Sequence, residues 1–525
     1  MPFDQTLLLP QLLQRRALER GDEVCVDVVD GDSRTYAELD AGVRQWAAAY
    51  QRLGVDAGDT VLTMLPNRLE AFSAWLGAAW LRAIEVPVNT AYRGYLLRHV
   101  LNDSRATVMV VDERFVPVLA EVASELEHLR TVVVLGDASV AGAIDLPVLD
   151  VQEFLEGAEP KELDGPAHYD TACMIYTSGT TGPSKGVLMS WRELYEFPGY
   201  MPDGFFVTGR GYYLVLPLFH VSGKQGIWSA ALYGARLVIR DGFSVSNFWS
   251  DIKAYDCPTT SLLGAMGAML FKAPPHPDEE GSPLESVSMG PMIAELDEFR
   301  ERFGVRVTSG FGMTEIGVAL ATDGYNVSDW RSCGRPRAGY DLRIVDGYDE
   351  EVPVGTVGEL VVRTAEPWMV CSGYWNQPEK NAAVWRNGWF HTGDGFRKDE
   401  AGNFYFCDRI KDAIRRRGEN ISSFEVEAYA MEHDGVLEVA AIGVASDVTE
   451  EDVKIVVVRK PDQELEAAEL HEFLRPRMPK FMVPRYIEFV DALPKTPTLR
   501  VQKVELRRDP VNAKTWDAEK EAARA

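Results

Sequence analysis

The sequence has few of the features that mark secreted, membrane-spanning or metal-holding proteins. Its 525 residues include only six cysteines, at positions 25, 173, 257, 333, 371 and 407, with no CxxC pair and no metal-ligand spacing. No apolar stretch approaches the roughly 20 residues that a membrane-spanning helix requires. The first residues lack the basic stretch and the long apolar core of a signal peptide. We therefore expect reduced thiols and a cytoplasmic protein.

An excess of positive charge is also lacking. The chain has 54 lysines and arginines against 80 aspartates and glutamates, which gives a formal net charge of −26. A charge of this sign argues against binding to long nucleic acids or to an anionic membrane surface. A small polyanionic ligand would need positive groups gathered locally. Hydrophobic residues make up 46% of the chain, which is ample for globular folding, and the length predicts at least two domains.

The pattern of apolar residues predicts an α/β fold. Residues 36–53 and 69–81 have helical periodicity, whereas residues 59–65, 106–111 and 131–135 are short apolar runs typical of buried strands. Alternation of this kind is typical of βαβ units with largely parallel sheets.

A β-rich stretch and a separate C-terminal module follow. Residues 340–375 contain short apolar runs broken by glycine and proline, which predicts a β-rich subdomain. After Asp408, a helix candidate at 423–432 is followed by alternating strand and helix candidates, the pattern of a compact α+β domain. We therefore expect a large N-terminal domain of βα subdomains over 1–407 and a small mobile domain over 408–525.

The segment Met174–Val187 has the composition of a phosphate-binding loop. Residues 177–186 contain five serine or threonine hydroxyls, three glycines, one proline and Lys185. Glycines let main-chain N–H groups converge on an anion, hydroxyls add further donors, and the lysine adds a mobile charge. The segment is not the P-loop of nucleoside triphosphatases, because no Gly-Lys-Ser/Thr step follows the spaced glycine. The alternative is a flexible surface loop.

Two further segments place a carboxylate beside a glycine-rich turn. Ser309–Gly317 contains Thr314 and Glu315, and a glutamate there suits a Mg²⁺ ion that bridges phosphates. The alternative is a turn with a solvated glutamate. In His391-Thr-Gly-Asp394, the carboxylate of Asp394 could accept hydrogen bonds from two ribose hydroxyls. The alternative there is an aspartate that caps a turn.

A basic run lies where the domain changes. Residues 409–417 hold five basic side chains against one acidic side chain. Alone, such a run is more often a solvated face than a binding surface. Here it would supply the local positive potential that a phosphate-bearing ligand needs in an acidic protein.

Taken in order, these four segments resemble those of the acyl-adenylate-forming superfamily, which comprises acyl-CoA synthetases, the adenylation domains of peptide synthetases and firefly luciferase. The resemblance covers nearly the whole chain and includes smaller matches at residues 217–223, 332–336, 373–375 and 494–497. The run 415–425 looks most like the carnitine/crotonobetaine-CoA ligase branch. The resemblance implies an enzyme that uses ATP to join a carboxylic acid to a thiol.

The resemblance also implies a set of site residues. The nucleotide would be held by Thr177, Ser178, Gly179, Thr180, Thr181, Gly182, Lys185, Gly290, Pro291, Gly310, Phe311, Gly312, Met313, Thr314, Asp394, Phe406, Arg409, Lys411, Gly418 and Glu419. Glu315 would bind Mg²⁺. The catalytic residues would be Arg500, Lys185, Glu315, Thr314 and His220. Gly290 and Pro291 belong to a degenerate form of the family's adenine-side strand.

The same resemblance implies a reaction in two steps. The loop at 177–185 would wrap the β- and γ-phosphates, Thr314 would contact the α-phosphate, and Asp394 with Arg409 would hold the ribose. The carboxylate attacks the α-phosphorus to give an acyl-AMP and pyrophosphate, and cations and main-chain donors stabilise the developing charge. The C-terminal domain would then rotate about Asp408 to admit the thiol.

One departure from the family pattern concerns the catalytic lysine of the C-terminal loop. When the run after Pro494 is aligned with the family, this lysine falls on Arg500, which keeps the charge but is bulkier and less mobile. Three interpretations compete: Arg500 substitutes for the lysine directly, Lys503 or Lys495 reaches into the site, or adenylation is weakened or altered. We favour Arg500.

Two ring-bearing residues are further candidates. Trp191 stands where many members have a histidine, and we expect it near the acyl pocket. His220 falls where relatives place a residue beside the substrate carboxylate, and the alternative is a hydrogen-bonded core histidine.

The predicted reaction is acid + ATP + CoA → acyl-CoA + AMP + pyrophosphate, with ATP, Mg²⁺ and CoA taking part. Three alternatives stay open: delivery of the adenylate to a carrier protein or an amine, an ATP-dependent diazotase that uses nitrite and an arylamine, and a non-catalytic nucleotide-binding regulator. One sequence does not reveal which acid is activated. The oligomeric state is also open, with a homodimer as one option, and no nucleic-acid or membrane partner is expected.

Overall fold

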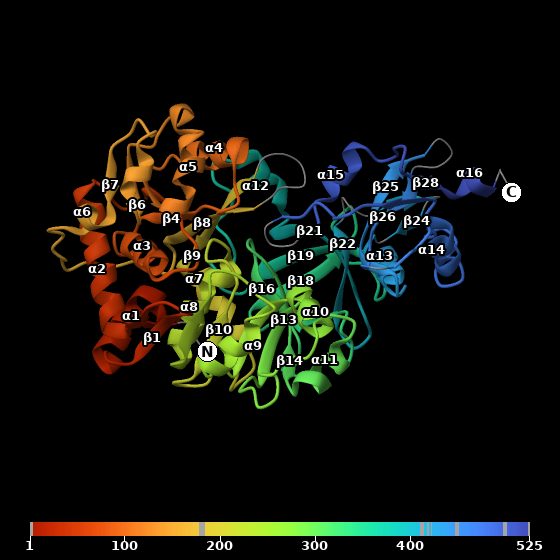
Figure 1. The fold of residues 1–525 in the computed structure, drawn as a ribbon, viewed down its shortest axis with the longest axis horizontal. Helices are drawn as coiled ribbons and strands as arrows, with labels where there is room; N and C mark the ends of the chain where they lie inside the picture. The colour runs from red at the N-terminus through yellow and green to blue at the C-terminus, as the bar shows by residue number, and fades with distance from the viewer. Residues whose placement is uncertain are drawn as a thin grey trace. The chain divides into compact units, whose positions relative to one another are not determined.

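The computed structural model describes residues 4–177, 184–409, 414–416, 419–421, 423–446, 451–461, 463–496 and 501–522. The chain forms two compact units, of which the first comprises Met1–Asp341 with Val362–Gly388 and the second comprises Leu342–Val361 with Trp389–Ala525. Figure 1 labels their helices and strands. These units are defined by contacts between elements and not by a hinge, so the expected domain boundary at Asp408 stays a prediction.

A seven-stranded sheet forms the first layer of the first unit, in the order β7-β6-β5-β3-β4-β8-β9. Its strands are β3 Thr60–Met64, β4 Ile84–Pro87, β5 Val108–Asp112, β6 Thr131–Leu135, β7 Val148–Asp150, β8 Thr171–Thr177 and β9 Lys185–Ser190. The paired neighbours are parallel except β8 and β9, which are antiparallel. β3 and β5 are buried along their whole length, and a parallel strand covered on both faces needs an unbroken apolar run.

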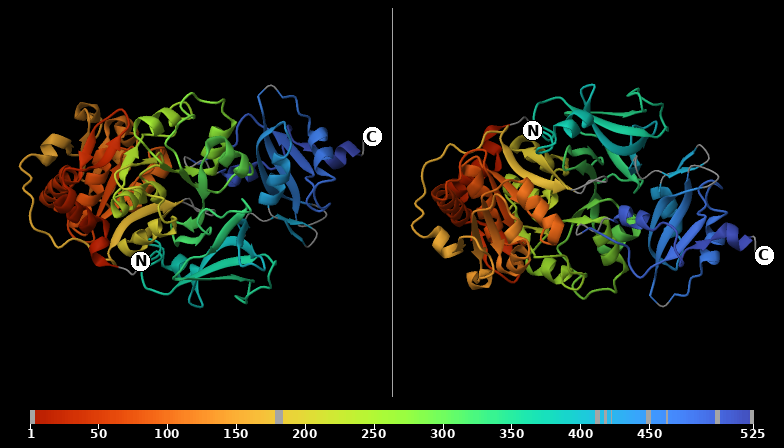
Figure 2. Two further views of the ribbon diagram at one scale, coloured as in Figure 1. Left: turned by 90° about the horizontal axis from the view of Figure 1, so that it is seen from below. Right: turned by 90° about the horizontal axis from the view of Figure 1, so that it is seen from above.

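A second seven-stranded sheet of the same unit has the order β14-β13-β12-β10-β11-β1-β2. Its strands are β1 Val24–Val28, β2 Ser33–Thr35, β10 Gly211–Leu214, β11 Arg236–Ile239, β12 Thr259–Leu263, β13 Ser286–Gly290 and β14 Arg306–Thr308. The pairs are parallel except β1 with β2. In Figure 2 the strands of the first sheet run from orange to yellow, and β11 to β14 of the second sheet are yellow-green to green.

Helices connect and cover these strands. They are α1 Leu9–Arg20, α2 Tyr36–Arg52, α3 Leu69–Trp80, α4 Gly94–Asp103, α5 Val116–Ala120, α6 Val151–Leu155, α7 Trp191–Glu196, α8 Val221–Tyr233, α9 Phe248–Ala254, α10 Gly264–Lys272, α11 Leu296–Phe303 and α12 Pro378–Val384, with a 3₁₀ turn η5 at Phe197–Tyr200. Thr35 and Glu38 form a capping box that begins α2. The predicted helices over 36–53 and 69–81 are confirmed by α2 and α3.

Three antiparallel strands complete the first unit: β15 Gly310–Met313, β16 Gly317–Ala321 and β17 Ser332–Pro336. β15 and β16 form a hairpin, and Thr314 and Glu315 lie in its turn. Glycine is required at Gly312, because a Cβ there would collide with the main-chain oxygen of Gly317.

The second unit contains an antiparallel sheet and a compact α+β module. The elements of this region are β18 Tyr340–Val345, β19 Gly358–Thr364, β21 Trp389–Lys398, β22 Phe404–Arg409, β23 Ile414–Arg416, β24 Glu419–Ile421, α13 Ser423–Met431, β25 Val436–Ala445, β26 Glu451–Arg459, α14 Ala467–Leu474, β27 Tyr486–Phe489, α15 Lys503–Arg508, β28 Trp516–Asp517 and α16 Ala518–Ala522, whereas the short strand β20 Trp385–Arg386 belongs to the first unit. The module sheet has the order β25-β26-β27-β28. Its core packs Ile455 and Val457 of β26 with Leu470 and Leu474 of α14.

The expected fold class is therefore confirmed: α/β, with parallel sheets, a β-rich portion and a small α+β module. Among the described residues, none of the helices is both long enough and apolar enough to cross a membrane.

Candidate active site

The two arms of the predicted phosphate loop are the ends of β8 and β9. Thr177 pairs with Lys185 in the antiparallel register, so these residues face each other at the base of the loop. The predicted loop residues Ser178, Gly179, Thr180, Thr181 and Gly182 lie outside the described part of the chain. Their contact with phosphates stays a prediction, whereas the position of Lys185 is fixed by its strand.

One aromatic residue, Tyr374, contacts both Lys185 and the predicted Mg²⁺ ligand Glu315. Its ammonium is 4.0 Å from the centroid of the Tyr374 ring, within the range of a cation–π contact. The Tyr374 hydroxyl donates a hydrogen bond of 3.0 Å to Glu315 Oε1. Two segments chosen separately from the sequence therefore meet in space, with Tyr374 between them.

Tyr374 is a residue of the candidate site that the sequence motifs alone do not single out. It lies in the matched segment 373–375, for which no role was inferred. That segment runs beside β9: Leu188 N–H donates to Gly373 O at 2.9 Å, and Trp375 N–H donates to Gly186 O at 2.8 Å. The match of the tripeptide Gly373-Tyr374-Trp375 to the family is the sequence signal that could have identified Tyr374.

Glu315 is buried, with 6% of its surface exposed. Its main-chain oxygen accepts from the N–H of Cys371 at 2.9 Å, which ties the hairpin turn to the segment that carries Tyr374. The alternative of a solvated glutamate is therefore wrong. Thr314 beside it is also buried. A buried, oriented carboxylate is the kind of ligand that Mg²⁺ takes together with phosphate oxygens, although the metal-binding role itself stays a prediction.

Two predicted nucleotide segments approach each other closely. A Cβ on Gly290, at the end of β13, would lie 3.6 Å from Gly310 O at the start of β15. Ser288, also on β13, shares a hydrogen bond of 2.9 Å with Tyr200 of η5. Gly290 is thus beside Gly310, and along β15 Gly312 is exposed while Phe311 and Met313 are half-buried.

A second buried carboxyl group, Glu193, was not anticipated. Its main-chain N–H is capped by Ser190 Oγ at 3.0 Å at the start of α7. The side chain is fully buried, and neither carboxyl oxygen has a hydrogen-bond partner among the described residues. Burial raises the pKa of Glu193 well above its ordinary value, and the negative charge of Glu315 raises it further. No sequence pattern marks a glutamate of this kind.

His220 is the N-cap residue of α8. Its Nδ1 lies 2.8 Å from Ser222 Oγ and 3.3 Å from Ser222 N. The side chain is partly exposed, so His220 is not a fully buried core histidine, and its role beside the substrate carboxylate stays a prediction.

Trp191 lies in the core of the first unit. It is 1% exposed and stacks on Trp75 with ring centroids 5.6 Å apart and an interplanar angle of 8°. On its other side the Trp228 ring is 6.2 Å away. The ring is thus enclosed by other side chains, and its expected place near an acyl pocket stays a prediction.

In the second unit, the predicted ribose-binding pair is formed. Asp394 and Arg409 are direct partners in the β21–β22 register, and Arg409 Nε lies 2.8 Å from Asp394 Oδ1. Asp394 is 2% exposed. Phe406, on the same hairpin, packs edge-to-face against Phe396 and Phe424. The structure brings these two residues together, and their binding of a ribose stays a prediction.

Several other predicted site residues of the second unit are not among the residues that the structure describes. Lys411, Gly418 and Arg500 are outside the described residues, and the structure describes only the backbone of Glu419. Within the basic run, Arg416 is 6% exposed and pairs with Asp452 at 2.9 Å. The charge of Arg416 is therefore neutralised within the module and does not add to the local positive potential that the sequence predicted.

The two alternative catalytic lysines, Lys503 and Lys495, both form ion pairs. Lys503 Nζ lies 2.7 Å from Glu427 Oε1 and also contacts Ser423. Lys495 Nζ lies 2.5 Å from Glu438 Oε1. Each ammonium therefore has a carboxylate partner within the module.

The α/β architecture, the loop flanked by β8 and β9, and the Lys185–Tyr374–Glu315 group together define a class: enzymes that activate a substrate with a nucleotide through an adenylate. Comparison with known proteins agrees. The model of the AMP-binding enzyme family matches residues 13–375, and that of the AMP-binding enzyme C-terminal domain matches residues 425–499. The chain belongs to this family, and the recognition of the acyl-adenylate-forming superfamily is confirmed.

Relatives and solved structures point the same way. The chain is 31% identical over 486 residues to a crotonobetaine/carnitine–CoA ligase of Proteus mirabilis, covering 90% of this chain and 93% of that protein. It is similar to the anthranilate CoA ligase AuaEII solved with anthranoyl-AMP, with a TM-score of 0.85, 25% identity and 98% of each chain covered.

Another solved structure is the O-succinylbenzoate coenzyme A synthetase MenE of Bacillus subtilis with ATP and magnesium, with a TM-score of 0.81 and 25% identity over 94% of this chain and 98% of that one. These relatives are CoA ligases, and they support an AMP-forming acid–CoA ligase over the other predicted activities.

Proposed function

We propose that this protein is an ATP- and Mg²⁺-dependent carboxylic acid–CoA ligase that works through an acyl-AMP intermediate. The observation that carries the proposal is the Lys185–Tyr374–Glu315 group. Lys185, the proposed phosphate-side cation, and Glu315, the proposed Mg²⁺ ligand, contact the same tyrosine, and ATP-dependent activation of a carboxylate needs such charges gathered around the phosphates. Membership of the AMP-binding enzyme family supports the same reaction.

The residues present suit a bound Mg²⁺–ATP. Among the described residues no group of three or more His, Cys, Asp or Glu side chains gathers as a metal cage, and Mg²⁺ that bridges phosphates needs only one or two carboxylates. Glu315 would supply that carboxylate, and Tyr374 holds it in one orientation. When bound, the metal neutralises charge on the phosphates. Lys185 adds a second positive charge on the loop side.

Asp394 and Arg409 would form the ribose side of the site. Arg409 approaches one oxygen of the Asp394 carboxylate, and a carboxylate has further lone pairs with which it can accept from sugar hydroxyls. Arg500 would bridge the substrate carboxylate and the α-phosphate. Lys503 and Lys495 form ion pairs with Glu427 and Glu438. These pairs give no reason to prefer either lysine to Arg500 as the catalytic cation.

The finer features of the proposal concern substrate and setting. The crotonobetaine/carnitine–CoA ligases among the relatives favour a small carboxylic acid as substrate. We propose that the protein acts in the cytoplasm on small molecules, without a nucleic-acid or membrane partner, and that a homodimer is its assembly to test first.

One assay tests the reaction. ATP and Mg²⁺ are supplied with L-carnitine, crotonobetaine, benzoate, anthranilate or a short fatty acid, and AMP and pyrophosphate are measured with CoA, without CoA, and with nitrite plus an arylamine. Acid-dependent AMP that needs CoA for steady turnover supports the ligase. Turnover only with nitrite and the arylamine would establish a diazotase, and absence of AMP under every condition would support a regulator.

A second experiment tests the catalytic cation. We expect Arg500→Ala to slow adenylation by a factor of roughly a hundred or more, since it removes a charge that acts in the transition state, whereas Lys503→Ala should slow it much less. Rates of acid-dependent pyrophosphate release give both numbers. The reverse order would assign the role to Lys503.

A further inference from the structure

A second charged pair, away from the phosphate loop, is buried in the first unit. Lys224 in the first turn of α8 forms an ion pair with Glu85 of β4, and the side chain of each is only 3% exposed. The two residues are 139 positions apart in the chain. Their pairing joins a helix that follows a strand of the second sheet to a strand of the first sheet.

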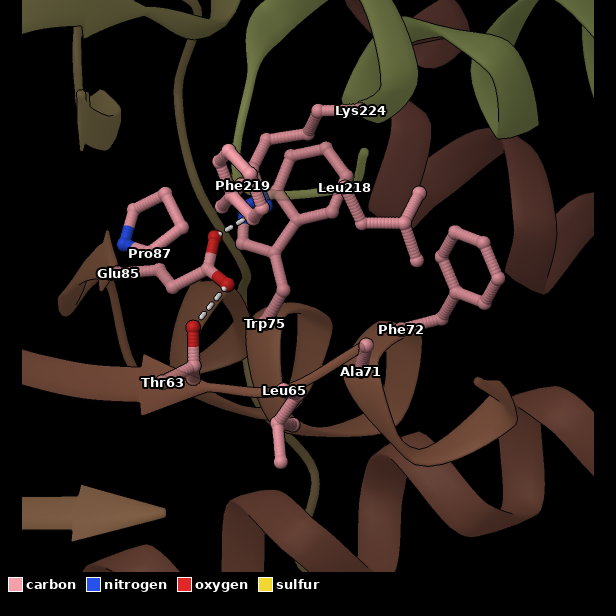
Figure 3. Close-up of a pocket in the computed structure, with 10 residues that line it drawn as sticks. All are labelled: Thr63, Leu65, Ala71, Phe72, Trp75, Glu85, Pro87, Leu218, Phe219 and Lys224. Carbon is pink, nitrogen blue, oxygen red and sulfur yellow. Dashed lines mark hydrogen bonds and ion pairs between the residues drawn. The ribbon is translucent and has the colours of Figure 1, made fainter. Parts of the chain in front are cut away.

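The surroundings of this pair are polar only at a few points. Thr63 Oγ1 donates a hydrogen bond of 2.8 Å to Glu85 Oε1, and Lys224 Nζ lies 3.9 Å from the centroid of the Trp75 ring. The rest of the lining is apolar and encloses a cavity of about 10 Å³, close to the space that one water molecule needs. Figure 3 shows Lys224 and Glu85 meeting beside Trp75, with Phe219 and Leu218 on the same cavity.

Stability alone is a weak reason for such a pair. Removing two charges from water costs several kcal/mol per ion, and buried pairs can often be replaced by apolar residues without loss of stability. Lys224 gains a carboxylate and an aromatic face, and Glu85 gains two donors, so the pair is well satisfied. Satisfied buried pairs of this kind specify one arrangement of the elements that carry them.

The element that Lys224 fixes is the one that begins with His220. Lys224 N–H donates to His220 O at 3.0 Å, which closes the first turn of α8. The segment before the helix packs closely against its first turn, because a Cβ on Gly223 of α8 would collide with the main-chain oxygen of Pro217. Asn67 holds the loop further back, accepting from Leu218 N–H at 2.9 Å. His220, the N-cap residue of α8, is therefore coupled to Lys224 through the first turn of the helix.

We propose that the Lys224–Glu85 ion pair is a positioning pair that fixes the first turn of α8 and thereby the orientation of His220 toward the substrate acid. Lys224 and Glu85 act through His220 and do not touch the reacting atoms. The kinetic part of the proposal rests on the proposed ligase function, whereas the effect on the conformation of His220 does not.

The test compares two double variants. Lys224→Met with Glu85→Leu removes both charges, so that neither partner remains as an unpaired buried ion. Lys454→Met with Glu488→Leu is the matched control, because Lys454 and Glu488 form a buried ion pair of 2.5 Å in the second unit. The single variant Lys224→Met is a further arm, which leaves Glu85 buried without its cation.

Two readouts are measured on each full-length variant that melts cooperatively. The first is the rate at which diethyl pyrocarbonate modifies His220, measured by mass spectrometry of the peptide. The second is the KM for the most active acid of the panel and the KM for ATP, both measured from pyrophosphate release. The first readout does not depend on any enzymatic activity, so failure of the proposed function and failure of this proposal can be told apart.

We expect the Lys224/Glu85 double variant to change the modification rate of His220 several-fold and to raise the KM for the acid about tenfold. The KM for ATP should stay within about twofold, and the control should change neither readout. An unchanged modification rate at His220 in this double variant, or equal changes in the control, would overturn the proposal. An equal rise in both KM values would also overturn it, since it would indicate a general disturbance of the unit.

Discussion

Tyr374 connects the lysine and the glutamate of the candidate active site, and it reaches Glu315 through a hydrogen bond from its hydroxyl. Without that hydroxyl the ring would still face Lys185. The loss of one hydrogen bond to a buried charged acceptor costs roughly 1–3 kcal/mol. The orientation of Glu315 should therefore depend on this single oxygen atom.

We predict that Tyr374→Phe lowers the rate of adenylation about tenfold and raises the Mg²⁺ concentration needed for half-maximal rate, because Glu315 is no longer held in one orientation. Pyrophosphate release measured against Mg²⁺ concentration gives both values. Tyr340→Phe is the control, since Tyr340 is also buried and its hydroxyl contacts a main-chain oxygen, that of Met369. An unchanged Mg²⁺ dependence in Tyr374→Phe would remove Tyr374 from the site.

Glu193 has a consequence for stability as a function of pH. Because burial raises its pKa above the ordinary value of 4.5, the folded protein holds a proton that the unfolded chain releases. The contribution to stability is fully present below about pH 4.5 and is lost as the pH rises toward the folded-state pKa. The slope is at most about 1.4 kcal/mol per pH unit.

We predict that Glu193→Gln melts at a higher temperature than the parent protein at pH 8 and at nearly the same temperature at pH 5, since glutamine does not titrate. Thermal melts at the two pH values measure the difference. The exposed Glu162 provides the control variant Glu162→Gln, for which no pH-dependent difference is expected. A difference for Glu193→Gln that is the same at both pH values would contradict the assignment.

At the scale of single elements, the β15–β16 hairpin decides where Thr314 and Glu315 lie. The sequence predicted a glycine-rich turn with a carboxylate, and the structure adds that the turn is buried and tied to Cys371. The close approach of β15 to β16 at Gly312 leaves no room for a side chain. The hairpin geometry therefore depends on glycine at this position.

We predict that Gly312→Ala raises the KM for ATP by tenfold or more and lowers the melting temperature, because the two strands must separate to admit a methyl group. Gly242→Ala is the matched control in the same unit, since nothing lies within 4 Å of a Cβ at Gly242. Steady-state kinetics and a thermal melt distinguish the two variants. A Gly312→Ala variant with the parent's KM for ATP would show that the hairpin does not contribute to nucleotide binding.

At the scale of the whole molecule, the six cysteines behave as the sequence predicted. All are free thiols, and only Cys333 is not fully buried. Burial raises the pKa of the Cys25 thiol to about 12 and that of Cys407 to about 11. A thiol reacts through its thiolate, so the buried thiols should be inert in the folded protein.

We predict that the native protein reacts rapidly with no more than one equivalent of a disulfide reagent such as DTNB at pH 8, at Cys333, and that six equivalents react after unfolding in guanidinium chloride. The absorbance of the released thiolate counts both. Two or more rapid equivalents in the native state would show that a second cysteine is accessible.

Net charge over the whole molecule proved a poor guide to the candidate site. The value of −26 suggests that polyanions are repelled, yet Lys185 lies beside the predicted phosphate loop. Part of the basic run that seemed to offset the acidity is neutralised within the second unit, where Arg416 pairs with Asp452 and Arg409 with Asp394. Local pairing, which the sequence does not reveal, decides how much positive potential remains.

The sequence by itself determined the α/β class, the family, and the selection of Lys185, Glu315 and Asp394 as candidate site residues. These depend on periodicity and on residues adjacent in the chain, which are readable locally. Only the tertiary structure decided two contacts between distant residues. Tyr374 contacts both Lys185 and Glu315, although it is 59 positions from the glutamate in the chain. Lys224 forms an ion pair with Glu85. Such contacts depend on how sheets and helices bring distant segments together, and a linear pattern contains no record of which buried charge will face which partner.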